Sequence, residues 1–251
     1  MADTTTERQR AGAELTGRRV VVIGGTSGIG LATAQRAAQL GAEVVVASRT
    51  SRSVADALDR LPGTATGHVL DVRHPEGVAE LFETVGPHDH LAFTAGDPLS
   101  FAPLGQSDLT AMQSFLDVRL WGAVAAVRAA LPFVRRSITL SGGAGLLRPG
   151  PGFTTAAIAL GAIDAFTRAG ASELAPIRVN AVFPGVVRSP LWRSLSEAEQ
   201  ERFFAEAAET IPVGRVGTTE DIARTFTHLM TSEYTTGQVL IVDGGASIGA
   251  R

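Results

Sequence analysis

The sequence contains no cysteine and no lysine, only one tyrosine, Tyr234, and only one asparagine, Asn180. Without cysteine, neither a disulfide nor a thiolate metal site can form. Without lysine, every basic side chain apart from histidine is an arginine, and any mechanism that needs a lysine amine is excluded. The five histidines show no metal-ligand spacing, so no metal ion is expected.

Strong charge and long apolar runs are also missing. A net charge of -3 provides no general basic surface for nucleic acid. No apolar run approaches the roughly 20 residues that span a bilayer, so no membrane partner is expected. The segment Met1–Arg10 is polar and does not resemble a secretory signal. We therefore expect a cytoplasmic protein that begins with a flexible tail over residues 1–16.

From residue 18 onward, short β-branched runs alternate with longer alanine-rich stretches, which is typical of repeated βαβ units. This pattern predicts one doubly wound Rossmann-type α/β domain over residues 17–251, a parallel sheet with helices on both faces. The expected strands are Arg19–Ile23, Glu43–Ala47, Gly67–Leu70, His90–Thr94, Ser137–Ser141, Arg178–Val182 and Gln238–Val242. The expected helices are Leu31–Leu40, Val78–Val85, Leu109–Val134, Thr154–Glu173 and Glu220–Met230.

One Glu-rich amphipathic insertion, residues 189–212, interrupts the alternation. It suits either a mobile lid over a ligand site or two ordinary surface helices. Both interpretations stay open at the level of sequence.

A glycine-rich loop follows the first expected strand directly and precedes the first expected helix. Gly24 suits a tight turn, Gly28 permits close approach of a pyrophosphate, and Gly30 permits close packing of strand and helix. The helix N-terminus adds backbone N–H donors for phosphate. The residues expected to bind a dinucleotide here are Gly24, Thr26, Ser27, Gly28, Ile29 and Gly30.

The end of the second strand indicates which dinucleotide is bound. An acidic residue at this position would bind the adenosine ribose hydroxyls, but none is present. Ser48, Arg49 and Thr50 provide two hydroxyls and a guanidinium, which suit a 2′-phosphate dianion. The sequence therefore favours NADP(H) over NAD(H).

Taken together, these motifs resemble those of the classical short-chain dehydrogenases/reductases, from about Gly17 to the C-terminus. The matching segments are the glycine loop, Leu70-Asp71-Val72, Thr94-Ala95-Gly96, Arg178 to Gly185, Thr236-Gly237 and Val242 to Gly245. The resemblance implies further cofactor contacts from Asp71, Val72, Ala95, Gly96, Pro184, Gly185, Val187 and Ser189. It also implies a homo-oligomer, a tetramer or a dimer, built on the long helices.

The same resemblance implies a catalytic asparagine, serine, tyrosine and lysine, which this sequence does not supply. Ala156 falls at the tyrosine position and Leu160 at the lysine position. Gly142 or Gly143 falls at the serine position, next to Ser141, and Arg119 replaces the asparagine. Because Ala156 and Leu160 share one helix face, the usual catalytic face is predicted to be an apolar wall.

The sequence leaves several functions open. The first is an NADP(H)-dependent carbonyl or alcohol oxidoreductase with a non-standard proton-delivery system, a wide apolar pocket and a small-molecule substrate. The second is a catalytically silent NADP(H)-binding sensor or partner subunit, and a lyase or cyclase ranks last. The candidate catalytic residues are Arg119, Ser141 and Thr155, with Arg119 facing either the cavity or an ion pair with Asp117 or Asp97.

Overall fold

The strands that the sequence predicts lie side by side in one parallel sheet. In the computed structural model, which describes residues 14–98 and 102–249, this sheet has the strand order β3-β2-β1-β4-β5-β6-β9. The strands span Arg19–Ile23 (β1), Glu43–Ser48 (β2), Thr66–Val69 (β3), His88–Phe93 (β4), Val134–Ser141 (β5), Arg178–Pro184 (β6) and Val239–Val242 (β9). The order reverses between β1 and β4. In a doubly wound sheet, ligands bind beyond the carboxyl ends of the strands at such a point.

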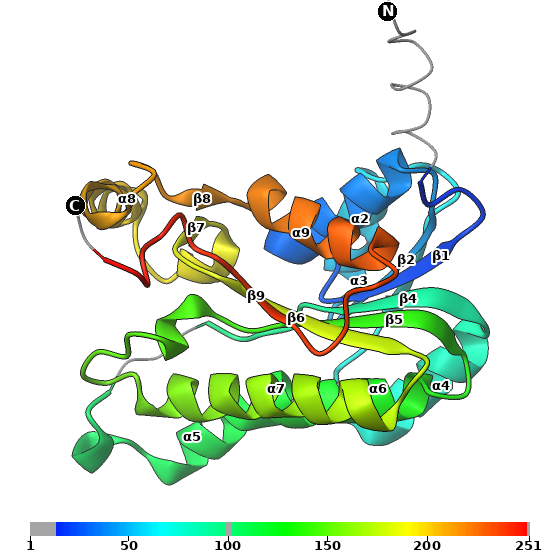
Figure 1. Cartoon of the computed structure of the whole chain (residues 1–251), viewed down its shortest axis with the longest axis horizontal. Coiled ribbons are helices and arrows are strands. Elements are labelled where there is room, and N and C mark those ends of the chain that lie inside the picture. The colour runs from blue at the N-terminus through cyan, green and yellow to red at the C-terminus, as the bar shows by residue number, and fades with distance from the viewer. Residues whose placement is uncertain (1–13, 99–101, 250–251) are drawn as a thin grey trace, which may run out of the picture.

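Helices cover both faces of the sheet (Figure 1). One face carries α2 (Gly28–Gln39), α3 (Ser51–Leu58) and α9 (Thr219–Thr231). The other carries α4 (Pro75–Val85), α5 (Leu109–Leu116), α6 (Gly122–Ala130) and α7 (Thr154–Glu173). The predicted single α/β domain of Rossmann type is confirmed.

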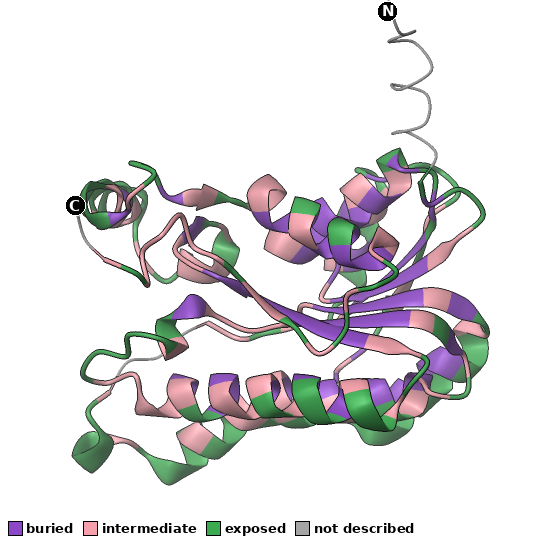
Figure 2. Cartoon of the chain, in the orientation of Figure 1, coloured by how far each residue is buried: buried purple, intermediate pink, exposed green. Residues whose placement is uncertain are grey.

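The alternation of side chains along β1 explains why both faces need cover. Val21 and Ile23 belong to the core cluster under α4, α6 and α7, whereas Val20 and Val22 belong to the cluster under α2 and α9. Successive side chains of a strand point to opposite faces, so an all-apolar strand is stable only between two helical layers. Figure 2 shows the resulting pattern of buried strands and helices with exposed outer faces.

The prediction of one helix over Leu109–Val134 is wrong. The segment consists of α5, a π-helical turn at Asp117–Trp121, and α6, and Val134 already begins β5. Pro132 follows shortly after the end of α6, where it cannot continue a helix. Apolar periodicity alone does not separate these segments because apolar residues recur through all of them.

The sequence analysis did not predict helix α3. Its N-cap is Thr50, whose hydroxyl accepts a hydrogen bond from the backbone N–H of Ser53. This is the usual way in which a threonine satisfies a free donor in the first turn.

The Glu-rich insertion folds around a small apolar cluster of its own. It contains a short 3-10 turn at Pro190–Trp192 and helix α8 (Glu197–Thr210). Strands β7 (Val187–Arg188) and β8 (Gly217–Thr218) pair in parallel at its base. Phe204, Ile211 and Val216 form the buried cluster. Motion of residues 189–212 as a lid stays a prediction.

The predicted tail over residues 1–16 needs one correction. Residues 1–13 lie outside the described part of the chain, but Leu15 is 1% exposed and packs in the cluster under α2 and α9. Its backbone N–H also donates to Leu40. The folded domain therefore begins before Gly17. Within residues 14–98 and 102–249, no helix combines the length and apolar character needed to cross a membrane.

Candidate functional site

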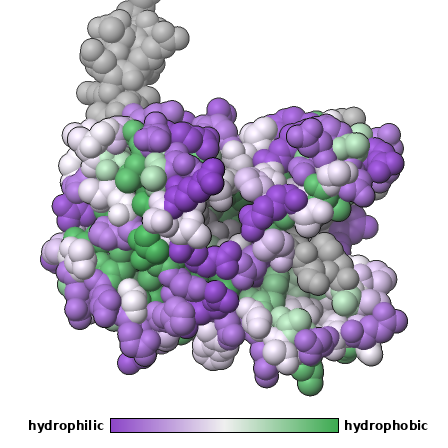
Figure 3. Space-filling model, turned by 180° about the vertical axis from the view of Figure 1, so that it is seen from behind, coloured by the Kyte–Doolittle hydropathy of each residue, from purple (hydrophilic) through white to green (hydrophobic). Residues whose placement is uncertain are grey.

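A cleft of about 840 Å³ opens beyond the carboxyl ends of the strands, where the fold places ligand sites. Figure 3 shows the molecule hollowed between the lobe that carries α8 and the rest of the body. All of the predicted site residues line this cleft except Asp71 and Thr155. The topology thus brings together residues from the ends of β1, β2, β4, β5 and β6.

The glycine loop packs so closely that side chains are excluded from it. Gly24 has a φ of 82°, and a Cβ there would lie 2.6 Å from the backbone nitrogen of Ala95. A Cβ on Gly30 would lie 2.2 Å from the carbonyl oxygen of Gly24. Ser27 is the N-cap of α2 but makes no side-chain cap hydrogen bond. The first turn of α2 therefore opens towards the cleft with backbone donors suited to an anion.

At the end of β2, Arg49 reaches an acid that the sequence did not assign to the cofactor site. A guanidinium nitrogen of Arg49 lies 3.1 Å from Oδ1 of Asp97, beyond the end of β4. Thr50, which was expected to face a phosphate, uses its hydroxyl to cap α3. The hydroxyl of Ser53, also in the cleft lining, lies 3.5 Å from that of Ser48.

Asp71 is not among the residues lining the cleft. Its carboxylate accepts hydrogen bonds from the side chain and the backbone N–H of Arg73. These hydrogen bonds lower the pKa of Asp71 to about 2 against the opposing effect of burial. Its neighbours Leu70 and Val72 do line the cleft, so the segment lies at the predicted place with its acidic side chain turned to Arg73.

Arg119 lies in the π-helical turn and lines the cleft. Its Nη2 donates to the backbone carbonyl of Asp97, and its guanidinium lies 4.8 Å from the ring centre of Phe115. Its Nε is buried without a hydrogen-bond partner. A Cβ on Gly96 would lie 2.8 Å from the guanidinium carbon, so a side chain there would shift the guanidinium from this position. Burial lowers the pKa of Arg119, and the nearby charge of Asp97 opposes this shift.

The two ion pairs considered for Arg119 from sequence do not form. Asp97 bonds Arg119 through its backbone carbonyl, while its carboxylate contacts Arg49. Asp117 makes no ion pair with Arg119 in the described part of the chain. One residue, Asp97, therefore contacts both Arg49 and Arg119 in the cleft.

The part of the cleft lined by α7 is apolar, as the sequence predicts. Ala156 is 3% exposed and Leu160 is 7% exposed, and both line the cleft. A Cβ on Gly142 would lie 2.0 Å from the ring of Phe183, whereas one on Gly143 would make ordinary contact with Leu160 at 3.5 Å. Only Gly143 could accept a side chain in the position that the resemblance assigns to serine.

Of the two hydroxyl candidates, only Ser141 faces the cleft. It is the last residue of β5 and lines the cavity. Thr155 precedes Ala156 on α7 and is absent from the lining. A step of one residue rotates a helix by about 100°, which turns Thr155 away when Ala156 faces inward. Thr155 is therefore not among the residues that line the cleft, and a catalytic role for it stays a prediction.

The sequence analysis missed the aromatic side chains that line the cleft. They are Phe115, Phe153, Trp192 and Phe203, together with the polar residues Arg148, Arg193, Asp243 and Ser247. Trp192 and Phe203 lie with their rings 4.5 Å apart. The aromatic residues come from separate elements, so no local motif identifies them as a group.

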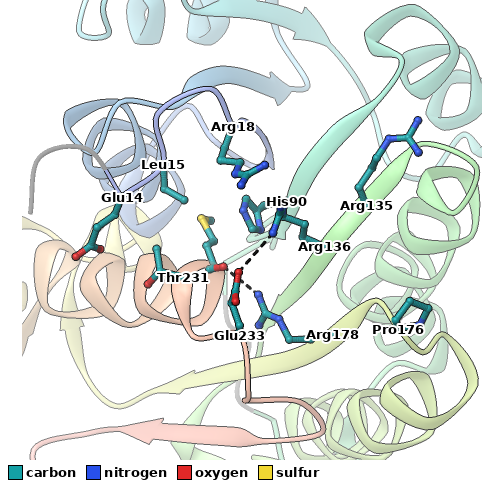
Figure 4. Close-up of a pocket in the computed structure, with 11 residues that line it drawn as sticks. Glu14, Leu15, Arg18, His90, Arg135, Arg136, Pro176, Arg178, Thr231 and Glu233 are labelled. Carbon is teal, nitrogen blue, oxygen red and sulfur yellow. Dashed lines mark hydrogen bonds and ion pairs between the residues drawn. The ribbon is translucent and has the colours of Figure 1, made fainter. Parts of the chain in front are cut away.

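A second cavity, of about 630 Å³, lies at the amino ends of the strands, away from the cleft (Figure 4). Arg178 donates to the carbonyls of Leu229 and Met230 at the C-terminal end of α9. Arg18 and Arg136 both contact Oδ1 of Asp89, at 3.2 and 3.1 Å. These arginines satisfy groups of the fold itself, so this cavity gives no sign of a catalytic site.

Comparison with known proteins identifies the family. Residues 23–247 match the family model described as Enoyl-(Acyl carrier protein) reductase. Short-chain dehydrogenase/reductase ucsE of Acremonium sp is 34% identical over 260 residues, covering 95% of this chain and 98% of its own length. The chain therefore belongs to the short-chain dehydrogenase/reductase family, whose members include oxidoreductases.

Two solved structures resemble the whole domain. A small-chain dehydrogenase in complex with NADPH has a TM-score of 0.82 and 32% identity, covering 92% of this chain and 99% of its own. An NADPH-bound short chain oxidoreductase from Pseudomonas aeruginosa PAO1, described as containing an atypical catalytic center, has a TM-score of 0.84 and 30% identity. That match covers 92% of this chain and 97% of the other.

Proposed function

We propose that this protein is an NADP(H)-dependent oxidoreductase that interconverts a carbonyl group and an alcohol on a bulky, largely apolar small molecule. The observation that carries the proposal is one continuous cleft, which runs from the open N-terminus of α2 past Arg119 to a wall of apolar and aromatic side chains. The NADPH complexes of the two similar structures support the choice of cofactor. We further propose that the protein acts in the cytoplasm.

The residues of the cleft fit a dinucleotide phosphate. Gly24 and Gly30 let the loop pack where any Cβ would clash with neighbouring protein atoms, and the first turn of α2 offers N–H donors for the pyrophosphate. Arg49 is the side chain that would bind the 2′-phosphate. Val187 and Ser189, beside Pro184 and Gly185, would hold the nicotinamide end.

When bound, the cofactor supplies the hydride. Arg119 would stabilise the negative charge that develops on the substrate oxygen, because its guanidinium is a buried, preorganised donor. A guanidinium holds its protons too tightly to act as the general acid at neutral pH. Ser141 would orient a water molecule or a substrate hydroxyl that delivers the proton. Ala156 and Leu160 would keep bulk water away from the reacting carbon.

We also propose that catalysis proceeds without the family's usual asparagine, serine, tyrosine and lysine. The chain has no lysine, and its only tyrosine, Tyr234, is fully exposed and does not line the cleft. Proton delivery without a tyrosine and lysine pair is thus part of the proposed mechanism.

The test is to incubate the protein with NADPH and a panel of bulky aromatic and alicyclic ketones. Consumption of NADPH with formation of the matching alcohol by mass spectrometry is the expected result. Binding of NADPH without turnover of any ketone or of the corresponding alcohols with NADP⁺ would refute the oxidoreductase proposal.

The apolar wall at Ala156 and Leu160 favours one alternative, a catalytically silent NADP(H)-binding sensor or partner subunit. Binding without turnover is the result expected for it. A sensor needs a surface that changes when the cofactor binds, and hydrogen exchange with and without NADPH would locate such a surface.

We also propose that the protein is a homo-oligomer, a tetramer or a dimer. Leu109, Trp121 and Ile158, on α5, the π-helical turn and α7, are large apolar side chains exposed by 72%, 60% and 47%. Pairing of this face between two copies would remove these side chains from water. Light scattering at micromolar concentration should give a mass of two or four chains, and the mass of a single chain would contradict the proposal.

A further inference from the structure

The ion pair between Arg49 and Asp97 bears on how the cofactor is selected. It joins the end of β2 to the region beyond the end of β4, and β1 lies between these two strands. The pair therefore spans the carboxyl end of β1, where the glycine loop begins. With side-chain exposures of 46% and 29%, it lies at the rim of the cleft rather than in its interior.

We propose that Asp97 is a specificity-determining residue, because its carboxylate competes with the cofactor's 2′-phosphate for Arg49. The inference rests on the proposed NADP(H) function. Arg49 carries one positive charge, and its Nη2 already lies 3.1 Å from Oδ1 of Asp97. A 2′-phosphate can bind the same guanidinium face only by displacing the carboxylate.

NADH has no phosphate group at this position. Its ribose offers neutral hydroxyls, which do not compensate for a broken ion pair. The pair between Arg49 and Asp97 therefore stays formed when NADH binds. Asp97 consequently weakens NADPH binding and leaves NADH binding almost unchanged, which sets the preference between the two cofactors below what Arg49 alone would give.

The backbone carbonyl of Asp97 makes a separate contact that does not depend on its side chain. Its carbonyl accepts from Nη2 of Arg119. The substitution Asp97→Asn keeps this carbonyl and the side-chain shape and removes only the charge that pairs with Arg49. Asparagine is for this reason a better test than alanine.

The experiment is a double-mutant cycle measured by calorimetry on the full chain with NADPH and with NADH. Asp97→Asn should tighten NADPH binding about three- to fivefold, which corresponds to one partly exposed ion pair, and should change NADH binding less than about twofold. In an Arg49→Ala background, Asp97→Asn should change NADPH binding less than about twofold. Asp56→Asn, which removes a charge from α3 that lies 3.9 Å from Arg52, is the control and should leave both affinities within about twofold.

The other outcomes have distinct meanings. Equal tightening of NADPH and NADH would overturn the inference, since Asp97 would then obstruct both cofactors. An undiminished effect in the Arg49→Ala background would also overturn it, because the carboxylate would then act on the phosphate directly. If the wild-type protein binds neither cofactor, the proposed function fails and the inference fails with it, whereas tight NADPH binding without an Asp97→Asn effect defeats the inference alone.

Discussion

Partly exposed arginines lie at both the amino ends (the amino edge) and the carboxyl ends (the carboxyl edge) of the strands, yet they have different partners. At the amino edge, Arg178 is bonded to carbonyls at the end of α9, and Arg18 and Arg136 are bonded to Asp89. At the carboxyl edge, Arg49 and Arg119 both contact a single residue, Asp97. The amino-edge arginines satisfy helix ends and acids of the fold.

The carboxyl-edge arginines differ from these because both line the cleft. A buried Nε without a partner occurs at both ends of the strands, in Arg119 and in Arg19, so it does not distinguish them. The ion pair of Arg49 lies at the rim of the cleft, where a ligand can reach it. The comparison therefore predicts that amino-edge substitutions change stability, whereas carboxyl-edge substitutions change binding or turnover.

The largest expected effect is a loss of stability from a substitution at the amino edge. Arg178→Ala should lower the free energy of unfolding by about 3 to 4 kcal/mol, because the carbonyls of Leu229, Met230 and Thr235 lose a charged donor. Urea denaturation measures this loss. Arg168→Ala, which removes an exposed i,i+4 pair with Asp164, is the matched control and should cost less than about 0.5 kcal/mol. A cost as small for Arg178→Ala would show that the amino-edge contacts do not stabilise the fold.

At the carboxyl edge, Arg119→Ala should lower turnover about a hundredfold, or about 3 kcal/mol of transition-state stabilisation. NADPH affinity should stay within about threefold, since the proposed role of Arg119 is on the substrate oxygen. Steady-state kinetics with a ketone identified from the panel, together with calorimetry for NADPH, separate the two effects. Unchanged turnover would remove Arg119 from the mechanism and leave protonation by the substrate itself as the surviving account.

The amino edge should also make stability depend on pH through His90. Burial lowers the pKa of His90 to about 4 from an ordinary value of 6.5, so the unfolded chain binds the proton more readily. The stabilisation is present above pH 6.5 and is lost as the pH falls towards 4, about 2 kcal/mol between pH 7 and pH 5. His90→Asn should reduce this slope in urea unfolding at the two pH values. Equal slopes in the wild-type protein and the variant would contradict the assignment.

The smallest effect concerns cofactor choice. Arg49→Ala should reduce the preference for NADPH over NADH about tenfold, because a charge-assisted contact to the 2′-phosphate is lost. Its free energy of unfolding should change by less than about 1 kcal/mol, as is usual for a partly exposed ion pair. Calorimetry with both cofactors is the measurement. If the preference stays the same, Arg49 does not bind the 2′-phosphate.

The fold was predicted well because its strands, turns and helices are set by patterns among residues that are neighbours in sequence. The run Val20–Ile23 and the glycine loop after it predict a strand, a turn and a helix, and all three form in place. The stretch 109–134 was misread because a π-helical turn adds no signal to apolar periodicity. Helix α3 was missed because it is short, with only the eight residues Ser51–Leu58, and so gives little apolar periodicity.

The cleft was harder to predict, because its key contacts join distant segments. Asp97 contacts Arg49, 48 positions before it, and Arg119, 22 positions after it. No local motif links these residues, although the resemblance to a family placed Arg119 beside the cavity. Asp71 is the reverse case, because a contact local in sequence decides its side chain. Arg73, two residues away, donates hydrogen bonds to the carboxylate that the motif assigned to a ligand.

The separate apolar cluster of the insertion has a consequence for how this protein could diversify. Phe204, Ile211 and Val216 pack with one another and belong to neither cluster beneath the sheet. Trp192 and Phe203 pack against this cluster and also line the cleft. Residues 186–218, closed at their base by β7 and β8, therefore form a cassette. Val187 within it belongs to the cluster under α2 and α9, so exchanging the segment while keeping Val187 would reshape the substrate end and leave both layers of the main core untouched.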